Sequence, residues 1–490
     1  MTIHLLPKNF ASGLVSAHAE GRNAKFPCIP GKTPGRPALH TFLNPPSRRQ
    51  TGSTTTMTAS DGVATDRSEG GPTIAQGAGL ALALLGLINL FNYMDRVLFS
   101  VLLEPIKAEL GFSDARMGLL GGFAFALFYA VFGLAMGRLA DRTNRVRVIA
   151  VSLALWSLAT AACGLARSFI GLFAARMTVG VGEAGCVPSA HSLIGDLFPP
   201  ERRAWAVSVF TGIGSLGSMI GLVVAAALVA EHGWRMVFFY FGLPGLALAL
   251  VIPLVLREPP RGRFDRGGAT RPPALKPALA DLLGSAAVIH LLIAIPFYYV
   301  TVGLATWIPA FFQRVHGVGI ADFGRSGGLA LGLGVLIGTF AGGWLANRLI
   351  RRARSWEFRL PALAGLVSAP LFAATFLVGD TGLAYGLLFL AFLVSGLGMG
   401  PSMSCMQVVA GPHVRATAIA FMVFATSIIS YGGAPALVGL ISDLALAHGL
   451  ATDGGASLRL ALIVTLLPPL ISGLFFQAAL NRRRRIDPEL

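Results

Sequence analysis

Long apolar runs fill most of this sequence after a polar start, and short polar segments separate each run from the next. A helix that crosses a bilayer needs roughly 20 apolar residues, because each residue adds about 1.5 Å along the axis. The pattern therefore predicts an all-α membrane protein with twelve transmembrane helices, of which the eleventh is long enough to include a loop. The expected spans are 79–103, 116–140, 146–166, 168–195, 204–230, 234–256, 286–312, 324–350, 358–379, 382–409, 416–446 and 457–480.

Polar segments divide these spans into two sets of six. The longest connector is rich in Pro, Gly and Arg, and the polar N-terminal stretch contains no apolar run able to form a signal-peptide core. Met57 offers an alternative start that would shorten this stretch. The expected organisation is a disordered N-terminal tail over 1–77, a six-helix bundle over 78–257, a linker over 258–285, a second six-helix bundle over 286–480 and a basic tail over 481–490.

Charge changes the picture in two ways. Charged residues make up only 13% of the chain, about half of what a soluble protein carries. The net charge of +16 would suit a nucleic-acid partner, but Lys and Arg concentrate in every second connector, which indicates membrane topology instead. Because positively charged loops stay in the cytoplasm, we expect both termini and the linker there, and no nucleic-acid partner.

Short motifs in the first half return in the second half in the same order. GRLADR at 137–142 returns as GWLANR at 343–348, and HG at 232–233 returns as HG at 448–449. This repetition favours a duplicated six-helix unit in parallel orientation.

Several classes of function lack their motifs. The cysteines Cys28, Cys163, Cys186 and Cys405 are scattered without metal-ligand spacing, so we expect no metal and no cofactor. The sequence has no GxxxxGK[ST] string for an ATP-driven pump, and no HExxH or GxSxG string for an enzyme.

Charged residues inside the apolar runs are the candidate chemistry. Asp95 and Arg96 belong to NYMDR in the first span, and Arg176 and Glu183 lie in the fourth span. Each such charge costs roughly 2.5–3.5 kcal/mol near the bilayer centre, so it normally faces the bundle interior and marks a transport pathway. The alternative is that these residues only lock or pack the helices.

The positions of these residues set their depth. Asp95 lies eight residues before the outer end of its span at Leu103, and Arg176 lies eight residues after Ser168. Both are therefore about 12 Å below the outer face, and Glu183, two turns beyond Arg176, is about 10 Å deeper. A buried carboxyl group is a natural proton carrier, and Glu183 is the better candidate because it lies farther from Arg176.

The motifs resemble one large family of transporters. GRLADRTNRVR at 137–147 and RMTVGVGEA at 176–184 are similar to two motifs of the major facilitator superfamily. NYMDR, GWRMVF at 233–238, EPPRG at 258–262 and TVGLATWIP at 301–309 look most like its Spinster branch, associated with sphingolipid-like and lysolipid-like substrates. The resemblance covers residues 79–480, and the organic-anion symporters share an NYxDR-like first span.

This resemblance implies two bundles that rock around a central cavity in the inner membrane of a bacterium. It predicts a monomeric, proton-coupled secondary transporter for an amphipathic or lipid-like molecule, with an organic-anion symporter or a drug-efflux carrier as the alternative. It also makes the first and fourth spans neighbours, so that Asp95 can pair with Arg176. Protonation of Glu183 or Asp95 would then release Arg176. Duplicated halves and a gate motif disfavour a channel.

The resemblance also implies a gate between the bundles. Asp141 would clamp the two bundles in the outward-facing state, and Asp196 would engage the neighbouring arginines. Asn347 stands where an acid is often found, so the second copy should hold more weakly. The expected gate residues are Gly137, Asp141, Arg142, Arg145, Asp196, Asn347 and Arg348.

The second half carries aromatic and weakly polar residues in place of buried charge. With the charged residues of the first half, such a surface suits an amphipathic solute. The candidate cavity-lining residues there are Tyr298, Thr301, Trp307 and Gln407. The alternative for each of them is plain packing between helices.

Overall fold

The computed structural model describes residues 77–264, 275–410 and 414–485, and the statements that follow concern these residues. The chain divides into two units, residues 1–68 and 69–490, and all described residues belong to the second unit. The expected N-terminal tail up to residue 76, the linker residues 265–274 and the last five residues of the basic tail lie outside the described residues. Every regular element within them is helical, as the sequence predicts.

The first half forms one group of helices. Phe169–Glu183 and Cys186–Leu197 are two parts of one span that is interrupted after Glu183. The elements are α1 (Ala78–Leu110), α2 (Asp114–Gly118), the π-helical η1 (Leu119–Phe123), α3 (Ala124–Arg142), α4 (Arg145–Leu165), α5 (Phe169–Glu183), α6 (Cys186–Leu197) and α7 (Pro200–Val255).

The second half forms the other group. The seventh span continues through one turn of 3₁₀-helix, Ala305–Trp307, into the helix Ile308–His316. The twelfth span begins with a separate helix, Gly454–Val464. The elements are α8 (Leu275–Gly284), α9 (Ala286–Leu304), η2 (Ala305–Trp307), α10 (Ile308–His316), α11 (Ile320–Ile350), α12 (Trp356–Leu377), α13 (Thr381–Val409), α14 (Arg415–Thr426), the π-helical η3 (Ser427–Gly433), α15 (Ala434–Ala447), α16 (Gly454–Val464) and α17 (Leu467–Arg484).

Eleven helices of the described residues are long and apolar enough to cross a membrane. One of them, α7, is two spans that meet at Gly233, whose φ of 74° breaks the helix. The described part of the chain therefore contains the twelve predicted spans. Gly449 also has a positive φ, of 67°, so the two glycines of the repeated HG pair share a left-handed backbone.

The structure adds detail to the eleventh span and to the linker. The eleventh span contains no loop, because α14, η3 and α15 follow one another without a break, and its extra length includes a π-helical stretch. In the described part of the linker, α8 occupies residues 275–284.

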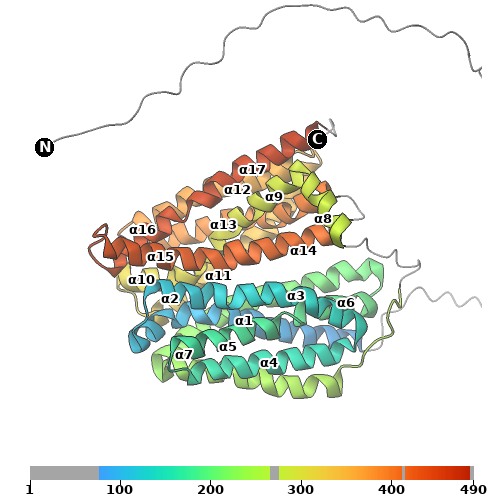
Figure 1. The fold of residues 1–490 in the computed structure, drawn as a ribbon, viewed down its shortest axis with the longest axis horizontal. Coiled ribbons are helices and arrows are strands. Elements are labelled where there is room, and N and C mark those ends of the chain that lie inside the picture. The colour runs from blue at the N-terminus through green and yellow to red at the C-terminus, as the bar shows by residue number, and fades with distance from the viewer. Residues whose placement is uncertain (1–76, 265–274, 411–413, 486–490) are drawn as a thin grey trace, which may run out of the picture. The chain divides into compact units, whose positions relative to one another are not determined.

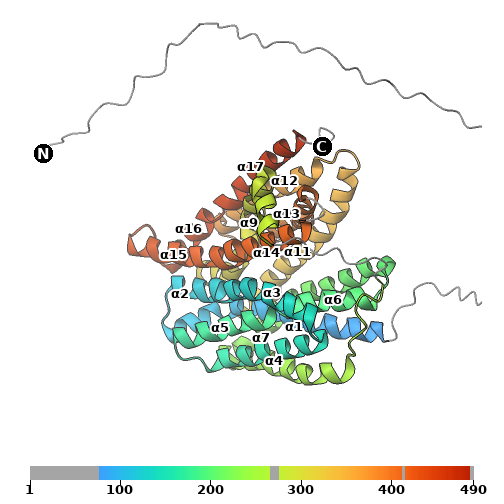
Figure 2. The same cartoon turned by 45° about the vertical axis from the view of Figure 1, so that its right-hand side comes forward.

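The helices form two bundles that contact each other along one side. Helices α1–α7 lie together, and α9–α17 lie together beside them (Figures 1 and 2). Contacts between the bundles join α7 to α11, α2 to α15, and α3 to η3. Large apolar side chains such as Leu254 and Ile170 are exposed on the outside, where a bilayer would cover them.

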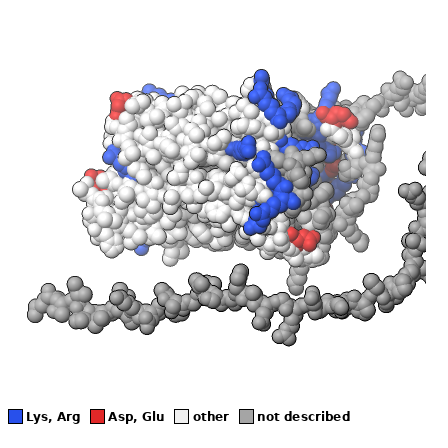
Figure 3. Space-filling model, turned by 90° about the horizontal axis from the view of Figure 1, so that it is seen from above, with Lys and Arg blue, Asp and Glu red and all other residues white. Residues whose placement is uncertain are grey.

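Charged side chains gather toward the two ends of the helices, and Lys and Arg concentrate at one of them (Figure 3). We call it the basic end; α3 ends there at Arg142, and the last turns of α11 and α17 carry Arg348 and Arg484. The other end, where α1 finishes and α2 begins, is called the opposite end.

Candidate functional site

An ion pair within the first bundle joins α1 to α5. The Nε atom of Arg96 lies 2.8 Å from Oε2 of Glu183, and the Glu183 side chain is fully buried. Glu183 is the last residue of α5, where the helix is interrupted before α6. Gly182 packs against the backbone of Trp156 in α4, so α5 approaches that helix more closely than a side chain would allow. The break and the close packing together position the Glu183 carboxylate inside the bundle.

Aromatic rings surround the Arg96 guanidinium. Its central carbon lies 4.5 Å from the ring centre of Tyr129, 5.3 Å from that of Phe125 and 5.4 Å from that of Tyr93. Such cation–π contacts attract a cation by roughly 0.5–2 kcal/mol. Arg96 is therefore held by one carboxylate and by a wall of aromatic faces.

Asp95 has a different partner from the one expected. The Thr160 hydroxyl donates to both of its carboxylate oxygens, at 3.0 and 3.1 Å. Among the described residues, no ion pair within 4.0 Å joins Asp95 to Arg176, so the expected pairing is not formed. Successive residues of a helix point about 100° apart, so Asp95 faces α4 while Arg96 reaches Glu183.

Arg176 is buried beside aromatic rings. Its guanidinium lies 5.1 Å from the ring centre of Phe99 and 5.5 Å from that of Phe125. Phe125 therefore contacts both Arg96 and Arg176, which places the two cations on the same aromatic side chain.

Several buried polar atoms of this site have no hydrogen-bond partner among the described residues. They include Nη2 of Arg96, Nε of Arg176, Oε1 of Glu183 and both amide atoms of Asn92. Buried polar groups are nearly always paired, and a water or a ligand is the usual partner where the protein supplies none. The arrangement can bind an anionic group with two guanidinium groups and can exchange a proton at a carboxylate.

Three of the candidate cavity residues in the second half are buried between helices. Tyr298, Thr301 and Trp307 are each 0% exposed. The Tyr298 hydroxyl donates to the carbonyl of Ser395, and the Trp307 indole donates to the carbonyl of Pro435 at 3.0 Å. Hydrogen bonds to backbone carbonyls satisfy these polar side chains, which favours the alternative that they pack between helices in this conformation. Gln407 is exposed near the end of α13.

At the basic end, Arg145 binds its own bundle. Its Nη1 atom lies 2.5 Å from Asp196 of α6, and its Nε atom lies 2.6 Å from Glu258, which follows α7. Glu258 also accepts a hydrogen bond from the backbone of Val146 at 3.1 Å. Arg145 is 1% exposed and joins three segments of the first bundle. In this conformation it therefore does not take part in the expected clamp between the bundles.

The other expected gate residues are largely accessible. Asp141, Arg142, Asn347 and Arg348 are exposed, and Gly137 is half-buried. The backbone carbonyl of Asp141 accepts a hydrogen bond from Arg261, a residue of the EPPRG segment. Arg348 lies over the ring of Trp344 in its own helix, at 5.7 Å. The clamp predicted from the motif is therefore not formed between these described residues.

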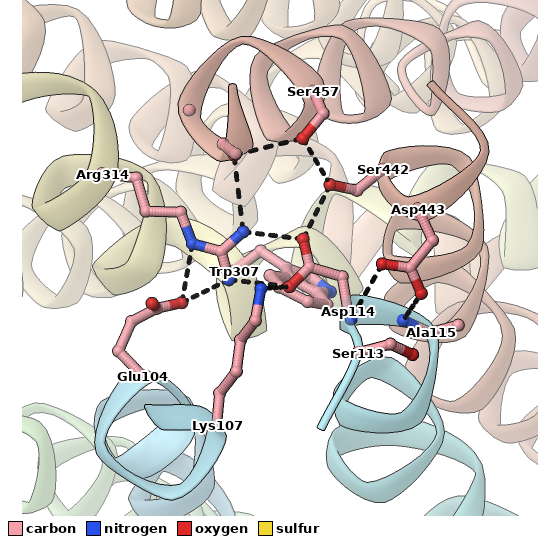
Figure 4. A network of polar contacts seen from close by, with 12 residues as sticks. Glu104, Lys107, Ser113, Asp114, Ala115, Trp307, Arg314, Ser442, Asp443 and Ser457 are labelled. Atoms are coloured by element: carbon pink, nitrogen blue, oxygen red, sulfur yellow. Dashed lines mark hydrogen bonds and ion pairs between the residues drawn. The ribbon is translucent and has the colours of Figure 1, made fainter. Parts of the chain in front are cut away.

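The opposite end holds an ionic network that the sequence interpretation missed (Figure 4). Arg314 of α10 lies 2.5 Å from Glu104 of α1 and 2.7 Å from Asp114 of α2. Asp114 also binds Lys107, and it accepts a hydrogen bond from Ser442 of α15 at 2.7 Å. Arg314 and Ser442 belong to the second bundle and the three other residues to the first, so the network fastens the bundles together at this end.

A signal for this network was present in the sequence. Acids and bases stand close together where α1 ends and α2 begins, and Arg314 directly follows the apolar run of the seventh span. Hydropathy explains Lys107 and Arg314 as charges at span ends, so it does not single them out as partners.

Comparison with known proteins identifies the family. The sequence profile described as Major Facilitator Superfamily matches residues 85–435. The MFS-type efflux pump of Mycolicibacterium smegmatis is 32% identical over 83% of this chain and 93% of the relative. Protein spinster homolog 1 of Mus musculus is 31% identical over 74% of this chain and 73% of the relative.

Solved structures of similar chains agree with this family. A bacterial homolog of the human lysosomal transporter Spinster, inward-facing and unoccupied, is 28% identical, with a TM-score of 0.76 over 85% of this chain and 99% of its own. The nucleoside transporter NupG, at 13% identity and a TM-score of 0.64, shares the fold. These likenesses confirm the predicted family, its Spinster-like character, and a multi-pass membrane transporter rather than an enzyme.

Proposed function

This chain belongs to the major facilitator superfamily, and from that premise we propose that it is a proton-coupled secondary transporter that moves an amphipathic or lipid-like small molecule by alternating access. The observation that carries this proposal is the ion pair between Arg96 and Glu183 inside the first bundle. The proposal includes protons as the coupling ion and a monomeric state, and it includes no nucleic-acid partner.

The orientation follows from the charge at the helix ends. The basic end carries Arg142, Arg348 and Arg484, and such ends stay in the cytoplasm. Both termini then lie in the cytoplasm, and the Arg314 network closes the face away from it. The inward-facing relative with a TM-score of 0.76 supports this assignment of the conformation.

Protonation of Glu183 would change the hold on Arg96. A neutral carboxyl group attracts the guanidinium less strongly than a carboxylate at 2.8 Å does. Arg96 would then be available to an anionic group of the substrate, together with Arg176, which contacts the same Phe125 ring. The released cation is Arg96, because Arg96 forms the ion pair with Glu183, and Arg176 forms none within 4.0 Å among the described residues.

The surroundings of the two arginines suggest the substrate class. Phe99, Phe125 and Tyr129 offer apolar faces directly beside two cations. An anionic headgroup on an apolar chain satisfies both features, which favours a lysolipid-like molecule. An organic anion or an exported drug is the second candidate, and the 32% identical efflux pump favours it.

The residues at the basic end would act in the other conformation. When the opposite end opens, the basic end has to close, and Gly137, Asp141, Arg142 and Arg348 are accessible for contacts between the bundles. Arg145, Asp196 and Glu258 would keep the first bundle rigid during this movement.

A transport screen tests the substrate class. Purified protein in liposomes that contain a pH-sensitive dye would be given a lysophospholipid, a dicarboxylate or a cationic drug. We expect a substrate-dependent pH change with the lysophospholipid, and a loss of that change in Arg96→Gln, with Arg325→Gln as an exposed control. Transport of the dicarboxylate or drug alone would replace the lipid-like substrate by the second candidate.

A further inference from the structure

Asp443 of α15 caps a helix that belongs to the other bundle (Figure 4). One carboxylate oxygen accepts a hydrogen bond from the backbone amide of Asp114 at 3.0 Å, and the other accepts from the amide of Ala115 at 2.8 Å. These amides begin α2, which continues through η1 into α3 as the second span. The first amides of a helix have no partner within it, so each needs an acceptor from elsewhere.

We propose that Asp443 is a positioning residue for alternating access. It caps the second span from across the bundle interface, and it thereby holds the opposite end closed and orients Asp114 toward Arg314. The proposal rests on the alternating-access part of the proposed function and needs neither proton coupling nor a particular substrate.

The partners of Asp443 indicate a cap rather than an ion pair. Both of its recorded hydrogen bonds come from backbone amides, and no Lys or Arg of the described residues lies within 4.0 Å of it. Asp114, by contrast, binds the side chains of Arg314, Lys107 and Ser442. A cap needs acceptor oxygens rather than a charge, and an Asn side chain, which has one acceptor oxygen, can satisfy one of the two amides that Asp443 satisfies.

Glycines bring the two backbones close enough for this cap. Gly439 lies one turn before Asp443 on the same face of α15, and a Cβ atom there would meet the backbone of Asp114. Gly118, one turn into the second span, packs in the same way against the backbone of Pro435. Gly439 and Asp443 therefore act together. The close approach of α15 to α2 at Gly439 places the Asp443 carboxylate within hydrogen-bond distance of the amides of α2.

The second span has its own cap as well. The Ser113 hydroxyl accepts a hydrogen bond from the amide of Arg116 at 3.4 Å. Because Ser113 belongs to the same bundle as the helix it caps, its bond survives when the bundles separate. The bonds of Asp443 cross the interface and do not survive, so of the two caps only that of Asp443 distinguishes the closed end from the open end.

The distance between two labels across the opposite end tests the proposal. Arg167 and Thr452 are exposed, lie in the connectors that follow α4 and α15, and belong to different bundles. Spin labels at Arg167→Cys and Thr452→Cys in full-length protein in nanodiscs, without substrate and at one pH, would report the ratio of open to closed ends. A cap is worth roughly a 2- to 30-fold change in such a ratio.

Four variants separate the possible roles of Asp443. We expect Asp443→Ala to raise the ratio within that range, and Ser113→Ala to leave it near the wild-type value. Asp443→Asn keeps an acceptor for one of the two amides, so it should raise the ratio less than Ala does. Asp443→Glu keeps the charge but moves the oxygens by one methylene, and it should open the end. If Asn opens the end while Glu keeps it closed, or if neither Ala nor Glu changes the ratio, the cap is overturned. The comparison of Asn with Glu decides even if the Ala variant does not fold, and no result here bears on proton coupling at Glu183.

Discussion

Arg96 of α1 and Glu183 of α5 form an ion pair of 2.8 Å inside the first bundle, while Asp95, the neighbour of Arg96, binds Thr160 of α4. Two adjacent charges of one helix thus contact two different helices. This division leaves Arg96 with one carboxylate partner among the described residues. Under the proposed function, protonation of Glu183 determines whether Arg96 is available to the substrate.

Thr160 supports the buried Asp95 carboxylate. In Thr160→Val the carboxylate loses the hydroxyl that donates to both of its oxygens. We expect the protein to be about 1–3 kcal/mol less stable, which is the usual loss when a buried acceptor becomes unpaired. Thermal unfolding in detergent measures this. Thr178→Val is the matched control, because the Thr178 hydroxyl donates only to Ala174 of its own helix. Equal shifts in the two variants would show that Thr160 has no special role.

Arg314 should hold the opposite end closed. In Arg314→Gln, Asp114 stays buried without its guanidinium partner, and Glu104 loses two hydrogen bonds. Breaking one side of a buried pair costs about 3–5 kcal/mol, so we expect the label distance across this end to shift to the open form. Arg325→Gln removes a pair whose side chains are 74% and 71% exposed, and it should change nothing measurable. A closed end in Arg314→Gln would contradict the assignment of this network.

Glu258 should stiffen the first bundle at the basic end. Its carboxylate binds Nε of Arg145 at 2.6 Å and the amide of Val146 at 3.1 Å. Glu258→Gln weakens both bonds beside a guanidinium that is 1% exposed, so we expect a lower unfolding temperature and slower transport. Glu201→Gln, an exposed acid in the first turn of α7, is the control. An unfolding temperature of Glu258→Gln equal to that of the control would remove the proposed role.

The sequence predicts the spans well, because hydropathy is a property of whole segments. Each of the twelve runs corresponds to a helix or half-helix of the described residues, and the break within α7 falls at Gly233 of the repeated HG pair. The π-helical stretch of the eleventh span could not be read in this way, since an extra residue within a helix leaves its hydropathy unchanged.

Which side chains of the site pair depends on how each helix is rotated about its axis. The depth of a residue in the membrane does not give that rotation. Asp95 and Arg176 were placed at equal depth, but equal depth does not make two side chains face each other. Tyr298 and Trp307 are polar enough to line a cavity, yet backbone carbonyls satisfy both inside the bundle. The network around Arg314 was missed for another reason: its members lie at span ends, where charge is expected for topology alone.

Glu183→Gln gives the most direct test of proton coupling. The variant keeps the size of the side chain and removes its charge and its ability to release a proton. In liposomes with a pH-sensitive dye and labelled lysophospholipid, we expect no substrate-dependent proton movement, while exchange of labelled for unlabelled substrate continues. Glu201→Gln should behave as wild type. If the Glu183→Gln protein moves protons with substrate at the wild-type rate, Glu183 is not the coupling residue and the central claim fails.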